Sequence, residues 1–229
     1  MRPRTIDDVV DNLEEVIDLC RHRKSAAGFF PALYRRVTLE VRDWIRTDRF
    51  DDSPRMERLD VLFADRYLDA WHGREAGRPT TRAWKAAFDA GEESAPIVLQ
   101  HLLLGMNAHI NLDLGIAAAS VAPGPDIEDL RADFLRINEI LAATVDDVQD
   151  RLADVWPLLH LLDWLARDED EAVVNFSMER ARDAAWEFAL RLAASPRDSW
   201  DAAISLTDEG VTDLARRSSD SASCARDDR

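Results

Sequence analysis

The chain has 229 residues, of which 46% are apolar, and this is enough for a single domain with a sizeable core. Only 8 glycines and few β-branched residues argue against a sandwich, a barrel or a doubly wound sheet, and favour a helical protein. The 29 basic and 45 acidic residues give a net charge of −16, which argues against binding to nucleic acid or to an anionic membrane.

Apolar residues recur at helical spacing through the N-terminal half of the chain. Four helices are predicted there, and each starts at a capping residue or a proline: Thr5, Pro31, Ser53-Pro54 and Thr80. The first is expected to end near Arg23, the third near Gly73 or Gly77, and the fourth before Gly91.

The C-terminal half continues this pattern. Pro96 opens a long apolar helix that is expected to end near Val121, before the break Pro123-Gly124-Pro125. Further helices are predicted from these starting points: Asp126, Trp156, Glu171 and, for a shorter piece, Ser199. Serine, aspartate and arginine dominate residues 217–229, so we expect a disordered polar tail there and a single helical domain over residues 1–216.

The predicted fold class is therefore all-α: a single orthogonal helical bundle of about eight helices around one buried central helix. The charged N-terminus lacks the apolar segment of a signal peptide, and Cys20 and Cys224 make no disulfide framework. The central stretch is interrupted by six polar residues, which is too polar for a membrane span. We expect a cytoplasmic protein, and its oligomeric state stays open.

The central helix, Ala95 to Val121, is apolar nearly all round, so other helices should surround it. Its polar residues fall into two stripes on nearly opposite sides: His101, His109 and Asp113 on one, Asn107 and Asn111 on the other. His109 and Asp113 are spaced i,i+4 and are neighbours on one face. That spacing suits two ligands of one metal, or an aspartate that orients an imidazole as a general base.

His101 lies eight residues before His109, about 12 Å along the helix axis. At that separation the two imidazoles do not easily share one ion, so His101 would serve a second ion or a substrate group. Burying each polar group unpaired costs roughly 1–3 kcal/mol, and a purely structural helix would use apolar residues instead. The cluster as a whole therefore predicts a functional pocket.

The leading interpretation is a helical enzyme with a largely apolar central pocket that acts on a small molecule, by proton transfer or by metal-assisted hydrolysis. The candidate catalytic residues are His109, Asp113 and His101. The candidate substrate-binding residues are Asn107, Asn111, Tyr34, Tyr67 and Arg182. The cofactor is unknown; a divalent metal such as zinc would bind His109 and Asp113.

The alternative is a non-catalytic small-molecule-binding or scaffold protein, whose buried His, Asn and Asp groups only specify packing. An open cavity that reaches His109 would favour chemistry or ligand binding, and tight packing around His109 would favour structure. Arg182 has two open roles as well: it pairs with a carboxylate of the central helix, or it holds an anionic substrate.

The central helix contains the string Gly105-Met106-Asn107-Ala108-His109-Ile110-Asn111-Leu112-Asp113-Leu114. This string resembles a bacterial family catalogued as domain of unknown function 5995, and weaker matches extend the resemblance over most of residues 1–195. The resemblance implies an all-helical fold and a site around the string, but no activity.

His109 and Asp113 also faintly resemble two zinc ligands on the central helix of zinc-dependent phospholipase C and the P1-type nucleases. Those enzymes carry further histidines just downstream, whereas the next one here is His160. A three-zinc site is therefore not supported, and carboxylates would have to complete a site for one or two ions.

Overall fold

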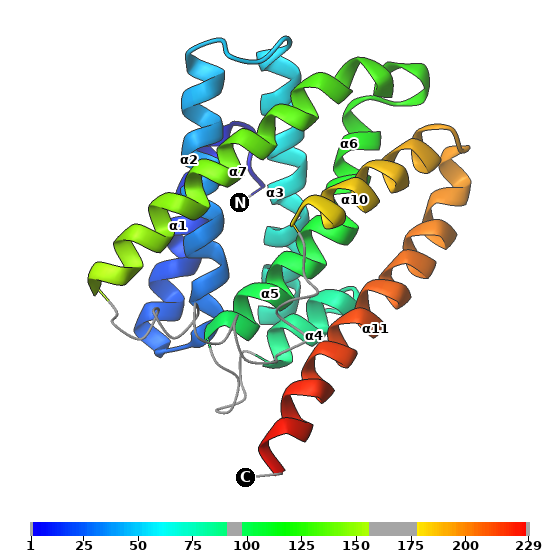
Figure 1. The fold of residues 1–229 in the computed structure, drawn as a ribbon. Coiled ribbons are helices and arrows are strands. Elements are labelled where there is room, and N and C mark those ends of the chain that lie inside the picture. Colours follow the sequence, from blue (N-terminus) through cyan, green and yellow to red (C-terminus); the bar gives the residue numbers. More distant parts are fainter. Residues whose placement is uncertain (1, 91–97, 156–177, 228–229) are drawn as a thin grey trace.

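The structure is a computed structural model that describes residues 2–90, 98–155 and 178–227 (Figure 1). These residues fold into helices with no strand among them, which confirms the all-α prediction. The helices are α1 (Ile6–Arg23), α2 (Phe29–Arg46), α3 (Ser53–Glu75), α4 (Arg82–Ala90), α5 (Val98–Ala108), η2 (His109–Leu114), α6 (Gly115–Val121), α7 (Ile127–Val155), α10 (Met178–Ala193) and α11 (Trp200–Asp227). When α5, η2 and α6 are counted as one continuous helix, the described residues form eight helices longer than a single 3-10 turn.

Capping residues set the starts of the N-terminal helices. The Thr5 hydroxyl accepts from the Asp8 amide at 3.1 Å, and the Asp8 carboxylate accepts from the Thr5 amide at 3.0 Å, so the predicted start of α1 is confirmed. The cap of α3 is Asp52, one residue before the predicted Ser53. Helix α2 begins at Phe29 rather than after Pro31, because a proline in the first turn has no amide that needs a partner.

The C-terminal part differs more from the prediction. Helix α11 continues to Asp227, so helical backbone runs through residues 217–227, where a disordered tail was expected. Extending an existing helix needs no new nucleation, which favours helix even in a polar sequence. The domain division at residue 216 stays a prediction. Pro96, the helix expected from Trp156 and the residues around Glu171 lie outside the described residues.

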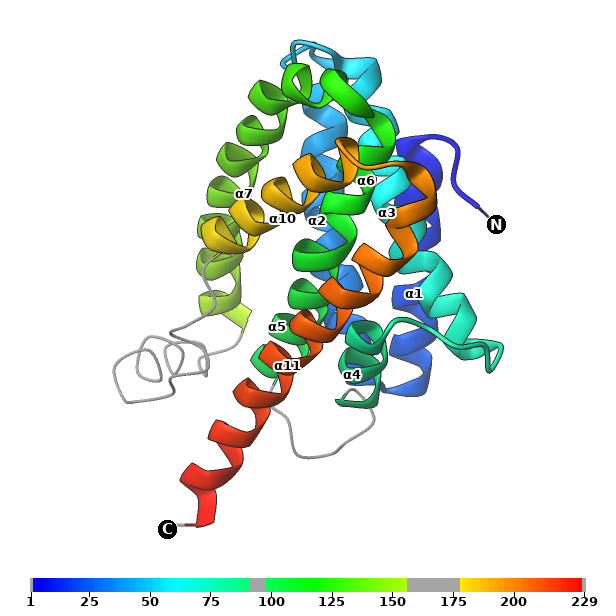
Figure 2. The same ribbon diagram turned by 90° about the vertical axis from the view of Figure 1, so that its right-hand side faces the viewer.

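The continuous helix α5–η2–α6 is the centre of the bundle (Figure 2). It contacts α2 and α4 through α5, α3 and α10 through η2 and α6, α7 through α6, and α11 through α5 and η2. By length and hydropathy its segment Leu102–Val121 is apolar enough to cross a membrane, but 72% of that stretch is buried inside the fold. It is the surrounded central helix that the sequence predicts.

Two glycines let neighbouring helices approach the central helix closely. A Cβ on Gly105 would lie 2.6 Å from the ring of Phe30 in α2. A Cβ on Gly115 would lie 2.8 Å from the carbonyl oxygen of Ala185 and 2.8 Å from the ring of Phe188, both in α10. Side chains at either position would force these helices apart, so the missing Cβ fixes their packing distance.

Buried aspartates fasten distant segments to the starts of α3 and α4. Asp133 in α7 accepts from the backbone amides of Asp51 and Asp52 at 2.8 and 2.9 Å and from Arg136 at 2.6 Å. Asp208 in α11 accepts from the amides of residues 82 and 83 at 2.8 and 2.9 Å. Each carboxylate thereby satisfies helix-start amides that have no partner within their own helix.

We expect Asp133→Ala to lower the free energy of unfolding by about 3 kcal/mol, because it strands the amides of Asp51 and Asp52 at a fully buried position and removes one of the two carboxylates that pair with Arg136. Asp129→Ala, at an exposed position in the same helix, is the matched control and should change stability by less than about 1 kcal/mol. Urea unfolding of both variants measures the difference. Equal effects would show that Asp133 does not hold the start of α3.

Candidate functional site

The central helix changes its hydrogen-bonding pattern at the candidate site. Residues His109–Leu114 form a π-helical turn, η2, a helical turn that is wider than an α-helical one because its hydrogen bonds span five residues instead of four. Such turns are rare and frequently lie at functional sites. His109 and Asp113 both belong to this turn. Both residues are buried, with only 2% and 1% of their surface exposed.

Asp113 accepts three hydrogen bonds inside the protein. Its Oδ2 accepts from Trp84 Nε1 at 2.7 Å and lies 3.4 Å from His109 Nδ1, while its Oδ1 accepts from Arg66 Nε at 2.6 Å. Trp84 belongs to α4 and Arg66 to α3. One carboxylate therefore ties the π-helical turn to two other helices.

The charges of this group balance. Burial acts to raise the pKa of Asp113, but the Arg66 cation and the hydrogen bonds from His109 and Trp84 outweigh it and hold the pKa below its usual value. Burial lowers the pKa of His109 in spite of its bond with Asp113. Near neutral pH the site thus contains an ionised Asp113, its Arg66 counter-ion and a neutral imidazole.

The neutral imidazole has a defined tautomer. An ionised carboxylate only accepts hydrogen bonds, so the proton of His109 lies on Nδ1, facing Asp113. Its Nε2 is then an acceptor with a free lone pair. This is the orientation in which an aspartate positions a histidine as a base.

Five aromatic side chains surround His109, and together they are called the aromatic cage: Phe30, Tyr34, Phe63, Tyr67 and Trp84. Their ring centroids lie between 3.5 and 6.2 Å from that of the imidazole. Phe63 lies flat on the imidazole, at 3.5 Å and an interplanar angle of 7°. Tyr34 meets it edge-on, at 4.6 Å and 71°. The imidazole is therefore enclosed by apolar ring surface.

Three polar atoms of this region lack a hydrogen-bond partner among the described residues. They are His109 Nε2 and the hydroxyl oxygens of Tyr34 and Tyr67, all buried. Burial raises the pKa of both tyrosines well above its usual value, so both hydroxyls keep their protons and can donate. Smaller effects of Asp60, Asp113 and Tyr67 raise the pKa of Tyr34 further.

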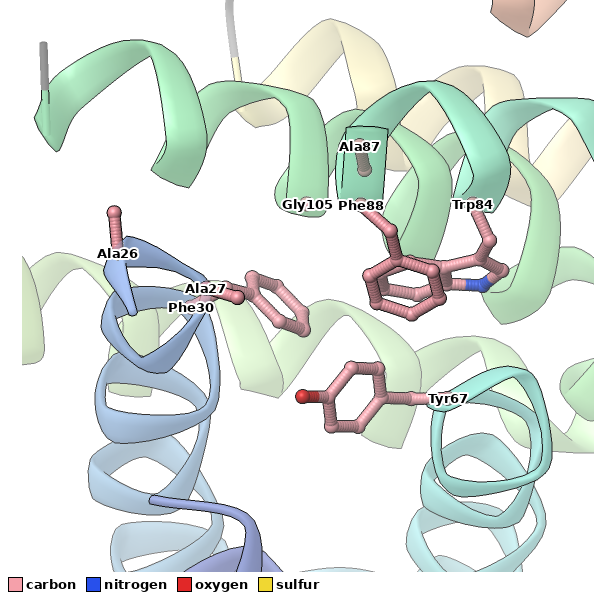
Figure 3. A pocket seen from close by; sticks show the side chains of 8 residues that line it. All are labelled: Ala26, Ala27, Phe30, Tyr67, Trp84, Ala87, Phe88 and Gly105. Carbon is pink, nitrogen blue, oxygen red and sulfur yellow. The ribbon is translucent and has the colours of Figure 1, made fainter. Parts of the chain in front are cut away.

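A small cavity adjoins the aromatic cage (Figure 3). It has a volume of about 20 Å³, room for about one water molecule. Its lining is apolar apart from one hydroxyl and one indole nitrogen, and consists of Ala26, Ala27, Phe30, Tyr67, Trp84, Ala87, Phe88 and Gly105. Phe30, Tyr67 and Trp84 are shared with the cage. His109 itself does not line the cavity.

Asp60 is a further buried acid beside the cage. It lies in α3, one helical turn before Phe63, and its Oδ2 has no partner within the described part of the chain. Burial, with a smaller effect of Glu57, raises the pKa of Asp60 from 3.8 to about 7. Sequence reasoning missed Asp60, since an aspartate in a charged helix is normally at the surface.

The structure brings Tyr34 and Tyr67 to His109, as expected for site residues, but separates the asparagines from it. The Asn107 amide donates to the Val211 carbonyl of α11 at 3.0 Å, and the Asn111 amide donates to the Asn107 side chain at 2.9 Å. The two asparagines therefore bind each other and α11. A contact with substrate stays a prediction for them.

Arg182 and His101 lie elsewhere. The Arg182 guanidinium donates to the Asn138 side chain and to the Phe134 carbonyl, both in α7, and stacks over the Phe134 ring at 4.5 Å. It pairs with α7 and not with a carboxylate of the central helix. His101 belongs to α5, and its side chain is outside the described residues.

His109 and Asp113 do not fit the expected pair of zinc ligands. Arg66 and Trp84 already donate to both oxygens of Asp113, and a cation bound there would face the Arg66 guanidinium directly. Over the part of the chain that the structure describes, no three His, Cys, Asp or Glu side chains gather into a metal site.

The comparisons with known proteins give one family. The model described as Family of unknown function (DUF5995) matches residues 6–219, which confirms the resemblance that the string around His109 carries. No curated protein and no solved structure matches the chain. The match transfers no activity.

His109 and Asp113 should differ in their effect on stability, because only Asp113 holds other helices. Asp113→Ala leaves Trp84 Nε1 and Arg66 without their acceptor and should lower the free energy of unfolding by about 3 kcal/mol. His109→Phe keeps a ring in the cage, removes an unpartnered nitrogen and should cost less than about 1.5 kcal/mol. Urea unfolding tests both. Equal large losses would show that the imidazole is a packing element.

Asp60 should make stability depend on pH. The pKa of Asp60 is higher in the folded state than in the unfolded state. Its contribution to the free energy of unfolding is therefore fully present below the unfolded pKa of 3.8 and is lost as the pH rises to about 7. Asp60→Asn stays neutral, so its stability relative to wild type should rise between pH 4 and pH 7, by up to about 4 kcal/mol, and then stay constant. Asp69→Asn, exposed on the same helix, is the control in urea unfolding. A difference independent of pH would contradict burial of an ionisable Asp60.

Proposed function

The chain belongs to this family of unknown function, DUF5995, and we propose that it is an enzyme in which His109, positioned by Asp113, acts as general base on a small uncharged molecule. The observation that carries the proposal is the buried neutral imidazole, whose Nδ1 faces Asp113 while its Nε2 has no partner among the described residues. A base oriented by a second group, with its reactive nitrogen free, is the arrangement that proton abstraction requires.

The tight aromatic packing around His109 is what a structural role predicts, but the unpartnered Nε2 argues against a purely structural imidazole. An imidazole that only fixes packing would have both nitrogens paired, because an unpartnered buried polar atom costs roughly 1–3 kcal/mol. Here Nε2 and the nearby Tyr34 hydroxyl both lack partners within the described residues. Functional sites typically contain groups that lower the stability of the folded protein, such as buried polar atoms without a partner.

The proposed reaction is a proton transfer. Nε2 of His109 takes a proton from an O–H or acidic C–H group of the substrate, and the bonding electron pair stays on the substrate. The imidazolium that forms is stabilised by Asp113, which Arg66 keeps ionised. Tyr34 can donate to an oxygen that gains negative charge. Return of the proton to a different substrate atom would complete an isomerisation.

A non-catalytic role is the second candidate, and the cavity favours it. A volume of about 20 Å³ holds a water molecule but no substrate, so a ligand enters only if side chains move. In that case the His109–Asp113 pair specifies packing or binds a ligand without reaction. For both candidates we propose a cytoplasmic protein with a small molecule as its partner, and its acidic charge balance argues against nucleic acid and an anionic membrane as partners.

The base role predicts the protonation of His109. Nitrogen NMR should show a neutral imidazole at pH 7 with the proton on Nδ1 and a pKa below 6.5, since burial favours the uncharged form. Activity should then persist as pH falls and be lost only below that pKa. An imidazolium at pH 7 would overturn the proposal.

The reaction itself can be sought by deuterium exchange. A panel of small uncharged carbonyl compounds is incubated with the protein in deuterium oxide, and loss of their acidic C–H signals is followed by proton NMR. His109→Gln should slow catalysed exchange at least 100-fold. His72→Gln, at an exposed histidine, should leave it unchanged. Exchange that survives in His109→Gln, or none with any compound, would favour the second candidate.

A further inference from the structure

Phe63 is the member of the aromatic cage that covers a face of the imidazole. Its ring lies nearly parallel to that of His109, with the centroids 3.5 Å apart and an angle of 7° between the planes. The other rings of the cage meet the imidazole edge-on or tilted. Tyr34 also packs edge-on against Phe63, at 5.8 Å, so these three rings hold one another in place. A ring face attracts a cation within about 6 Å of its centroid, and the imidazole lies well inside that range.

An aromatic face distinguishes the two protonation states of a histidine. The face of a benzene ring carries negative charge, so it attracts an imidazolium electrostatically, whereas a neutral imidazole stacks on it mainly by dispersion. The contact with Phe63 therefore favours the charged form of His109. It uses neither ring nitrogen, since Nδ1 faces Asp113 and Nε2 has no partner among the described residues.

Two charged groups act on His109 among the described residues. Asp113 of the same turn favours the imidazolium, and Arg66 of α3 opposes it. The two tyrosines of the cage keep their protons, and α4 presents an uncharged indole. Helices α10 and α11 also pack on the turn, but their buried charged side chains, Arg182 and Asp208, bind α7 and the start of α4. Burial has the largest effect and lowers the pKa of His109, so the imidazolium needs support that adds no further charge.

We propose that Phe63 is a positioning residue of the reaction, whose ring face stabilises the imidazolium of His109 and thereby strengthens the buried base. The inference rests on the proposed function, because it assigns a residue to the step in which His109 takes a proton. In that step a substrate O–H or C–H bond breaks, its electron pair stays on the substrate, and an N–H bond forms on Nε2. A contact that stabilises imidazolium more than imidazole stabilises the transition state more than the ground state, so it lowers the barrier.

The stacked pair also restricts the approach of the substrate. The lone pair of Nε2 lies in the plane of the imidazole, and this plane is nearly parallel to the Phe63 ring. The proton donor therefore has to arrive in the imidazole plane, beyond the edge of the ring. Phe63 stays in place during such an approach, so its contact with His109 persists throughout the proton transfer.

Fluorinated phenylalanines at position 63 test the role of the ring face. Fluorine withdraws electron density from the face but changes the size of the ring little, so His109 stays buried. Phe63 is replaced in turn by its mono-, di- and trifluorinated forms, and the pKa of His109 is measured by nitrogen NMR. The pKa should fall with each added fluorine, and the trifluorinated ring should weaken proton binding about threefold to tenfold. Cyclohexylalanine, which fills similar space without an aromatic face, should weaken it by a similar factor.

Phe134 is the matched control. It is a buried phenylalanine that packs against Trp186 with ring centroids 4.9 Å apart, and it makes no ring contact with His109. The trifluorinated ring at this position should leave proton binding by His109 within about twofold of wild type. Urea unfolding of all variants identifies any change in the pKa that comes from loss of the fold.

The inference is overturned if the pKa of His109 does not move along the fluorine series at position 63, or falls equally when Phe134 is fluorinated. Where deuterium exchange is catalysed, the pH below which it is lost should decrease together with the pKa of His109. An exchange profile that stays fixed while the pKa moves also overturns the inference. Failure of the proposed function is a different result: the pKa follows the fluorine series, but no compound exchanges in a reaction that depends on His109.

Discussion

The structure depends on the buried carboxylate of Asp113. Its two oxygens accept from Arg66, Trp84 and His109, which belong to α3, α4 and the π-helical turn of the central helix. A buried charge is tolerable only when it is paired and fully hydrogen-bonded, so these three helices have to meet at one point. The same contacts orient the imidazole, so the packing of the bundle and the chemistry of the site share one residue.

The aromatic cage follows from that meeting point. Helices α2, α3 and α4 present their rings to His109, and Gly105 leaves space for the Phe30 ring against the central helix. The enclosure lowers the pKa of His109 and excludes water, which strengthens electrostatic effects inside. It also leaves a cavity of only about 20 Å³ beside the cage, so access to the site requires a side chain to move.

The sequence predicted what depends on local spacing. The cap at Thr5, the apolar all-round central helix and the adjacency of His109 and Asp113 follow from helical geometry, and the structure contains them. Arg66 and the role of Trp84 at Asp113 were not predicted, because they come from other helices, 47 and 29 residues away. Periodicity gives the face of a helix but not which residue of another helix it meets.

The buried aspartates at helix starts have a consequence for the order of folding. The amides at the start of α4 bind Asp208, 125 and 126 residues later in the chain, and those before α3 bind Asp133, 81 and 82 residues later. During synthesis these N-terminal helices are made long before the carboxylates that complete them. The hydrogen bonds that complete the starts of α3 and α4 can therefore form only after α7 and α11 have been synthesised.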